Sequence, residues 1–164
     1  MQLRKATAED VVALRDLERA ANLVGLAHVF PPERHPFPDD AVLSRWVLVL
    51  EEPGVSVLVR DADTGTGLDV LVAHDDRSLR HLAVHPDRWG RGLASDAVDQ
   101  AVQAMAGRGT TEAELWCLAE NRRARRLYEH LGWTATADQR PAPWPPHPVE
   151  LRYVRTLAPG SAVT

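Results

Sequence analysis

The sequence predicts a single α/β domain, with a mixed sheet that carries helices on its faces. Short strand-like runs alternate with longer runs in which apolar residues recur at helical spacing. The length of 164 residues suits one core of ordinary size, and no internal repeat, linker or second domain is visible. We therefore expect one domain over residues 1–164, with the last few residues forming a flexible tail.

The first half of the chain predicts four strands and two helices. Thr7 is a candidate N-cap for the first helix, with Asp10 three residues later. Residues 29–40 hold four prolines and predict an irregular loop before the second helix. The expected order is a strand at 2–6, a helix at 8–24, a helix at 39–51, and strands at 54–60, 68–74 and 78–86.

The second half predicts two further helices and three strands. A helix from about Gly92 to Ala106 follows a glycine-rich turn, and Asn121 can cap a helix that ends before Gly132. The strands are expected at 113–119, 133–137 and 148–157, and the stretch 140–148, which leads into the last strand, holds five prolines.

Composition and charge restrict the classes of partner. The net charge of −4 is unlike that of a typical nucleic-acid-binding protein. Residues 77–130 nevertheless hold nine Arg against seven Asp and Glu, a basic neighbourhood suited to a multiply charged anion. Cys117 is the single cysteine, so no intramolecular disulfide can form. Without an apolar leader or a membrane-length run, we expect a cytoplasmic protein with no membrane partner.

The turn Gly90-Arg91-Gly92-Leu93-Ala94-Ser95 is the first motif with chemical content. Glycines let backbone N–H groups approach an anion closely, and the helix that follows adds its positive end. A dinucleotide fingerprint is an alternative, with Glu112 at the ribose-binding distance, but Ser95 occupies the third glycine position. An NTPase phosphate loop would need a Gly-Lys pair, and Lys5 is the only lysine.

A second motif follows from Asn121 through Tyr128 to Trp133. Together with the glycine turn, it resembles the GCN5-related N-acetyltransferase superfamily over about residues 77–134. The carrier loop of that family reads Gln/Arg-x-x-Gly-x-Gly/Ala, here from Trp89 to Ala94. Its later motif reads Asn-x-x-Ala-x-x-Leu-Tyr-x-x-x-Gly-Phe/Trp, matched from Asn121 to Trp133.

The resemblance implies a fold, a cosubstrate and residue roles. The central sheet would be mixed and mostly antiparallel, with a splayed fourth and fifth strand pair. Tyr128 would lie near the thioester of acetyl-CoA and act as the general acid for the leaving thiolate. Asn121 would touch the pantetheine or phosphate portion. The remaining carrier contacts would come from the backbone of Leu82, Ala83 and Val84, for pantetheine, and of Gly90, Arg91, Gly92, Leu93, Ala94 and Ser95, for the pyrophosphate.

The chain departs from the family pattern at two positions. Trp89 replaces the Gln or Arg of the carrier loop, so the polar side chain of that position is missing. Trp116 stands five residues before Asn121, where members that acetylate protein N-termini often carry a Glu that acts as the base. This argues against a protein N-terminus as acceptor and leaves the base unassigned.

His81 is a candidate general base, because imidazole titrates near neutral pH. An ordinary packed histidine, Asp75, Asp76 or a water chain are the alternatives. His74, His81 and His85 lack a matching carboxylate cluster, so we expect no metal.

Nine of the twelve prolines fall in residues 31–38 and 141–148. By resemblance these loops flank the acceptor side, where Phe37 and Trp144 would form an apolar wall or simply belong to rigid connections. We expect an acetyl-CoA-dependent N-acetyltransferase acting on a primary amine of a small-molecule acceptor by direct attack. The alternative is a non-catalytic acyl-CoA sensor of the same fold. The sequence does not decide which amine is the acceptor, which acyl chain is preferred, or whether the chain forms a homodimer.

Overall fold

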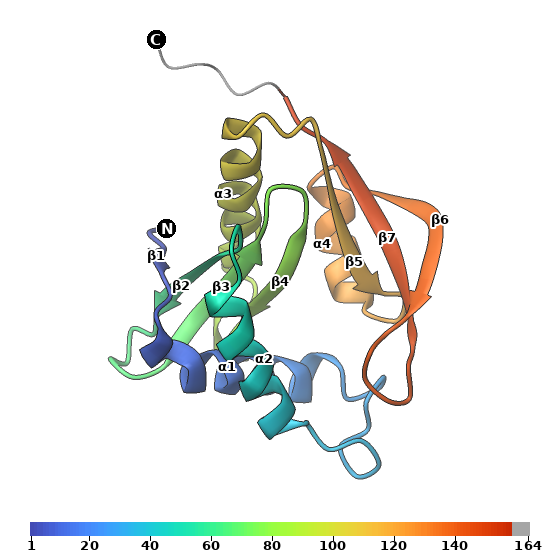
Figure 1. Ribbon diagram of the computed structural model, residues 1–164. Helices are drawn as coiled ribbons and strands as arrows, with labels where there is room; N and C mark the ends of the chain where they lie inside the picture. The colour runs from blue at the N-terminus through green and yellow to red at the C-terminus, as the bar shows by residue number, and fades with distance from the viewer. Residues whose placement is uncertain (159–164) are drawn as a thin grey trace.

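The computed structural model describes residues 1–158 as seven strands in two sheets, with four α-helices packed against them (Figure 1). The flexible tail expected at the C-terminus lies largely outside the described residues. The strands are β1 (Arg4–Lys5), β2 (Ser56–Asp61), β3 (Leu68–His74), β4 (Leu79–Val84), β5 (Glu112–Leu118), β6 (Thr134–Pro141) and β7 (Val149–Thr156). The helices are α1 (Val11–Gly25), α2 (Asp39–Glu51), α3 (Leu93–Gly107) and α4 (Arg122–His130), with 3-10 turns at Ala8–Asp10 and Pro86–Arg88.

The elements follow the expected order, with small shifts at their ends. The first turn of the expected first helix is the 3-10 turn, in which the backbone N–H of Thr7 donates to the Asp10 carboxylate at 2.7 Å. The fourth strand ends at Val84, two residues earlier than expected. β6 runs on through Pro141, beyond the expected end at residue 137. Proline is tolerated there because β6 is an edge strand, where a missing N–H breaks no ladder.

The two sheets meet between β4 and β5. The first sheet has the order β1-β2-β3-β4 and the second β5-β7-β6, and the ladders within both are antiparallel. A parallel bridge between Ser78 and Glu114 joins them at one end, where the Glu114 N–H donates to the Arg77 carbonyl at 2.8 Å. From there the strands spread apart (Figure 1). The expected splayed pair in a mixed, mostly antiparallel arrangement is therefore confirmed.

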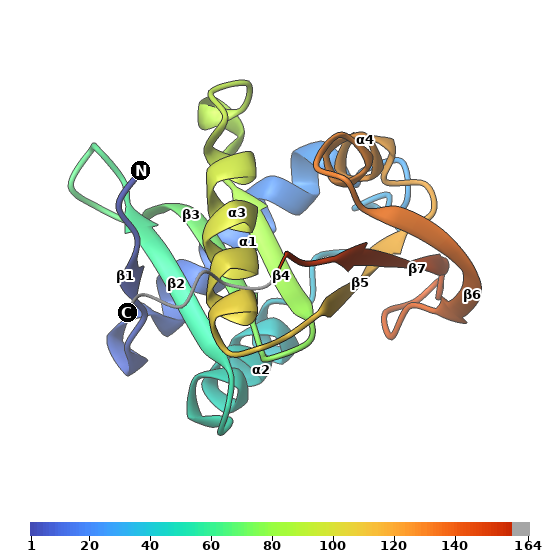
Figure 2. The ribbon, with the colours of Figure 1, turned by 90° about the horizontal axis from the view of Figure 1, so that it is seen from above.

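Helices cover both faces of the first sheet. Val70 and Val72 of β3 point into a core shared with α3 and α4, whereas Leu71 and Ala73 point into a second core shared with α1 and α2. This alternation is the period of two that a strand imposes. Figure 2 shows α3 and α1 crossing the sheet on opposite sides. β4 is the edge strand of the first sheet and β5 is the edge strand of the second. Along the gap between them, backbone N–H and C=O groups of both strands are therefore not used in a sheet ladder.

Candidate active site

The glycine turn after β4 presents a row of open backbone donors. Gly90 and Gly92 have φ angles of 77° and 78°, which glycine adopts without the cost imposed on other residues. Gly92 is also the N-cap of α3. Within residues 1–158, none of the six N–H groups from Gly90 to Ser95 has a protein acceptor. Such a row at a helix N-terminus is suited to an anion with several oxygens.

A cavity of about 390 Å³ lies beside this turn and is called the carrier cavity below. It combines the backbone of β4 with the start of α3 and the start of α4. Of the carrier-binding residues expected from the sequence, it is lined by Leu82, Ala83, Val84, Gly90, Gly92, Leu93, Ala94, Ser95 and Asn121. The side chain of Arg91 lies instead on a neighbouring cavity with Asp69 and Asp87. Tyr128 does not line the carrier cavity, although Ala124 and Leu127 of the same helix do.

Asn121 caps α4 as expected. Its Oδ1 accepts from the Ala124 N–H at 3.2 Å, which satisfies one of the open donors of the first helical turn. Asn121 also lines the carrier cavity, and its amide nitrogen makes no hydrogen bond within residues 1–158.

Tyr128 is packed rather than exposed. Only 8% of its surface is accessible, and its ring lies 6.2 Å from that of Trp133 and 6.4 Å from that of Tyr153. Burial raises the pKa of its hydroxyl, so the group keeps its proton at neutral pH. Within the described residues the hydroxyl has no hydrogen-bond partner. It is thus protonated, uncommitted and fixed by its neighbours.

His81 lies in a more apolar setting than its sequence suggests. The imidazole is 4.9 Å from the ring of Trp46, His81 lines the cavity between β4 and β5, and Arg45 and Arg80 are nearby. Burial and then these two cations lower its pKa to about 3. His81 is therefore neutral at physiological pH and a weak proton acceptor.

A central cavity of about 650 Å³ opens between the splayed strands. Its carboxylates are largely engaged. Glu18 pairs with Arg45 and accepts from Trp46 Nε1 at 2.8 Å, whereas Glu114 pairs with Arg152 at 2.8 Å.

The other acidic candidates are held in a similar way. Glu150 pairs with Arg140 at 2.7 Å. Asp75 accepts from the N–H groups of Arg77 and Ser78, at 2.8 and 2.7 Å. Asp76 pairs with Arg108 at 2.7 Å. No carboxylate among these is a free base aimed into the central cavity.

Trp116 lies on the wall of the central cavity, at the position where N-terminal acetylating members often carry a Glu. The guanidinium carbon of Arg140 lies 4.2 Å from its ring centroid. This part of the wall is an arginine-covered aromatic surface and offers no proton acceptor.

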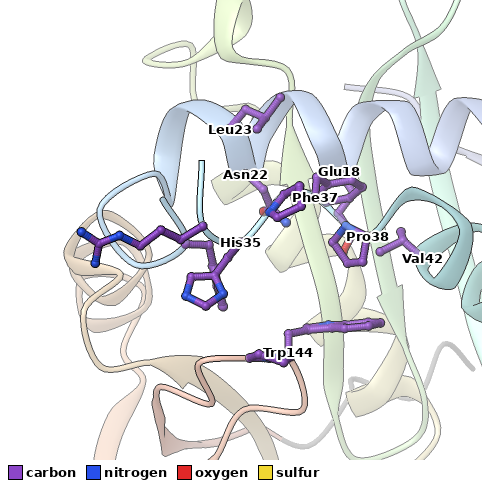
Figure 3. Close-up of a pocket in the computed structure, with 12 residues that line it drawn as sticks. Glu18, Asn22, Leu23, His35, Phe37, Pro38, Val42 and Trp144 are labelled. Carbon is purple, nitrogen blue, oxygen red and sulfur yellow. The ribbon is translucent and has the colours of Figure 1, made fainter. Parts of the chain in front are cut away.

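The two proline-rich loops come together around an apolar pocket of about 340 Å³ (Figure 3). Trp144 lies across the pocket from Phe37 and Pro38, and Glu18 and Val42 line the same space. The structure thus brings together Phe37 and Trp144, the two aromatic residues for which the family resemblance implies a place on the acceptor side.

Asn22 of α1 lines all three cavities, and no sequence motif singled it out. Its side chain is half-buried, and within residues 1–158 it makes no hydrogen bond. Glu18, four residues earlier, lines both the central cavity and the apolar pocket. The i, i+4 spacing put both on one helix face, but nothing in the sequence placed that face at the β4–β5 gap.

Neither a metal centre nor a membrane-spanning helix is found within residues 1–158. No group of three or more His, Cys, Asp or Glu side chains there is arranged to hold a metal ion. None of the helices in that range is both long and apolar enough to span a bilayer.

The open row of N–H donors, the carrier cavity and the central cavity all lie along the splayed strands β4 and β5. Residues 13–133 match the model of the acetyltransferase (GNAT) family, and the chain belongs to this family. The expected family and fold are therefore confirmed.

Known proteins similar to the chain agree with this family. Over 56 residues it is 45% identical to a mycothiol acetyltransferase from Beutenbergia cavernae, covering 34% of this chain and 19% of that protein. Over 101 residues it is 33% identical to the mycothiol acetyltransferase of Clavibacter michiganensis subsp. michiganensis, covering 60% and 32%. The match thus spans a third or less of these curated relatives.

A solved structure shows the same fold over nearly the whole chain. It is the PaiA N-acetyltransferase from Thermoplasma acidophilum in complex with coenzyme A, with a TM-score of 0.71. The identity is 15%, over 94% of this chain and 98% of that one.

Proposed function

We propose that this chain transfers an acetyl group from acetyl-CoA to a primary amine of a small-molecule acceptor. The observation that carries the proposal is the position of Asn22, on the wall of the carrier cavity, the central cavity and the apolar pocket at once. A carrier on β4 and an acceptor in the apolar pocket would therefore meet in the central cavity.

The acceptor is expected to join a primary amine to a compact apolar group. Phe30, Phe37, Val42 and Trp144 line the apolar pocket, and its volume of about 340 Å³ matches the smaller ligand pockets of proteins. Asn22 lies at its inner side, where its amide oxygen would accept from the amine. A long polyamine would place a second ammonium group in this apolar space. That ammonium would lose its hydration, so a polyamine is expected to bind poorly.

The reaction is direct attack. The neutral amine nitrogen forms a bond to the thioester carbonyl carbon, and the carbon–sulfur bond then breaks. Tyr128 gives its proton to the departing thiolate and regains one from solvent. After the attack the nitrogen is positively charged and must lose a proton. This proton leaves through water in the central cavity, because His81 is too weak a base to hold it.

Release of free thiol with a panel of amines tests the proposal. The panel contains arylalkyl amines, branched alkyl amines, amino acids, spermidine, an aminoglycoside, a peptide and the acceptor of the mycothiol acetyltransferases. Mass spectrometry must then find the product heavier by one acetyl group. Binding of acetyl-CoA without turnover of any amine would contradict the proposal.

The second candidate is a sensor that binds acyl-CoA without turnover. It is favoured by the ion pairs that Glu18, Glu114 and Glu150 make with arginines, which leave none of these three carboxylates uncommitted in the central cavity. Product formation separates the two functions, since the sensor would show carrier binding with no acetylated amine.

A further inference from the structure

Trp89, at the position where the GNAT pattern has Gln or Arg, is held rigidly beside the glycine turn. Its Nε1 donates to the Val84 carbonyl at 2.8 Å, which ties the ring to the end of β4. A Cβ added at Gly25 would lie 3.5 Å from the ring, so α1 passes close to its far edge. The ring is thus a fixed flat surface on the wall of the carrier cavity.

Arg123, the second residue of α4, lies on this surface. Its guanidinium carbon is 3.6 Å from the centroid of the Trp89 ring, within the range of a cation–π contact. The side chain stays open to solvent on its outer side, and it also lines the carrier cavity. Partial burial lowers its pKa from the ordinary arginine value, but the group remains charged.

The charge of Arg123 has no protein counterion within residues 1–158, where it makes no ion pair and no side-chain hydrogen bond. The neighbouring arginines of α4 differ. Arg122 lies 3.9 Å from Glu120, Arg125 donates to Tyr153 at 2.9 Å, and Arg126 donates to the Arg122 carbonyl at 3.3 Å. Among the described residues, Arg123 is therefore the arginine of this helix that is both uncommitted and turned to the carrier.

We propose that Arg123 binds a phosphate of coenzyme A and that Trp89 holds its guanidinium for this purpose. Stacking covers one face of the guanidinium and leaves its N–H edge free to donate to phosphate oxygens, often through two bonds at once. The six open N–H groups from Gly90 to Ser95 follow Trp89 directly in the chain, and most of these residues line the same cavity as its ring. Arg123 of α4, across the cavity, thus supplies the polar side chain that Trp89 itself cannot offer to the carrier.

Two phosphate groups of the carrier offer the same chemistry, the pyrophosphate and the 3′-phosphate of the ribose. The ring of Trp89 belongs to the residue next to Gly90, which favours the pyrophosphate. The inference rests on the proposed placement of the carrier in this cavity.

Calorimetric titration with coenzyme A and with 3′-dephospho-coenzyme A tests it. We expect Arg123→Ala to weaken binding of both by roughly tenfold or more, the usual effect of losing one charge-assisted hydrogen bond. Equal loss on both ligands assigns the contact to the pyrophosphate, and loss on coenzyme A alone assigns it to the 3′-phosphate. Either result supports the proposal, as does a weaker salt dependence of binding in the variant.

The matched control is Arg122→Ala, which removes an adjacent arginine that does not line the carrier cavity. It should bind both ligands as the wild type does. Trp89→Ala should release Arg123 and weaken binding, and combining it with Arg123→Ala should add less than the sum of the two effects. Circular dichroism and the thermal midpoint verify that each variant is folded.

Unchanged affinity of folded Arg123→Ala for both ligands would overturn this inference alone. Equal losses in Arg122→Ala and Arg123→Ala would also overturn it, because they would indicate a general charge effect. Failure of the wild type to bind coenzyme A would instead overturn the proposed function, and this inference with it.

Discussion

The imidazole of His81 lies 4.9 Å from the indole of Trp46, with the two rings inclined at 56°. Trp46 is fully buried, so the histidine shares its apolar surroundings and has Arg45 and Arg80 for neighbours. A proton on His81 would lose hydration and face these cations, which is why its pKa falls to about 3.

This relationship predicts a pH-dependent stability. The pKa of His81 is about 3 when folded and about 6.5 when unfolded, so the unfolded chain binds more protons between these values. The contribution is fully present above pH 6.5 and is lost as the pH falls toward 3, by at most about 1.4 kcal/mol per pH unit. Urea unfolding at pH 7 and pH 4.5 should show a smaller loss of stability for His81→Gln than for the wild type. Exposed His130→Gln is the control, and equal pH dependence in all three proteins would refute the effect.

Tyr128→Phe should lower kcat while leaving the fold intact. The variant keeps the ring that packs on Trp133 and Tyr153 and removes only the proton donor. General acid catalysis is typically worth about 10²–10⁴-fold, and water can replace part of it, so we expect a fall of at least about tenfold. Affinity for acetyl-CoA and the thermal midpoint should stay near the wild-type values. A full kcat, measured where chemistry limits the rate, would make Tyr128 a packing residue.

Gly92→Asp should weaken acetyl-CoA binding severely. The substitution puts an anion among donors that are suited to phosphate, and the φ of 78° adds about 1 kcal/mol of backbone strain. Gly65→Asp is a matched control, because Gly65 has a φ of 81° in the exposed turn between β2 and β3. Both variants should lose similar stability, while only Gly92→Asp loses carrier affinity by calorimetry. Wild-type affinity in Gly92→Asp would remove this turn from the site.

Phe37→Ala and Trp144→Ala should raise KM for the amine and spare carrier binding. Both residues line the apolar pocket, and neither lines the carrier cavity. Truncating a buried aromatic contact typically costs a few kcal/mol, so an increase in KM of about tenfold or more is expected with a well-fitting acceptor. Leu48→Ala, on the exposed face of α2, is the control. If steady-state kinetics gave an unchanged KM in both aromatic variants, the two loops would be rigid connections that do not bind the acceptor.

The helix at 39–51 and the cap at Asn121 were predictable because their signals are local. Prolines and glycines that end elements, capping residues and apolar periodicity all act within a few residues along the chain. They can therefore be recognised without knowing the tertiary structure. The glycine turn was predictable for the same reason, since six open N–H groups follow from its glycines and from the start of α3.

What surrounds these elements was decided only by the tertiary structure. From the sequence, His81 is a strand histidine that could titrate near neutral pH. Only the tertiary packing of α2 places Trp46 against it. Asn22 carried no signal, and nothing singled out Arg123 among the nine arginines of residues 77–130. Only the packed structure places the start of α4 and one face of α1 on the carrier cavity. Phe37 and Trp144 lie more than a hundred residues apart, and two loops had to converge before they formed a pocket.

The sequence by itself determined the elements, the family motifs and the donor-rich turn, because these depend on neighbours along the chain. The cavities, the lowered pKa and the uncommitted arginine depend on neighbours in space, which are set by how sheets and helices pack.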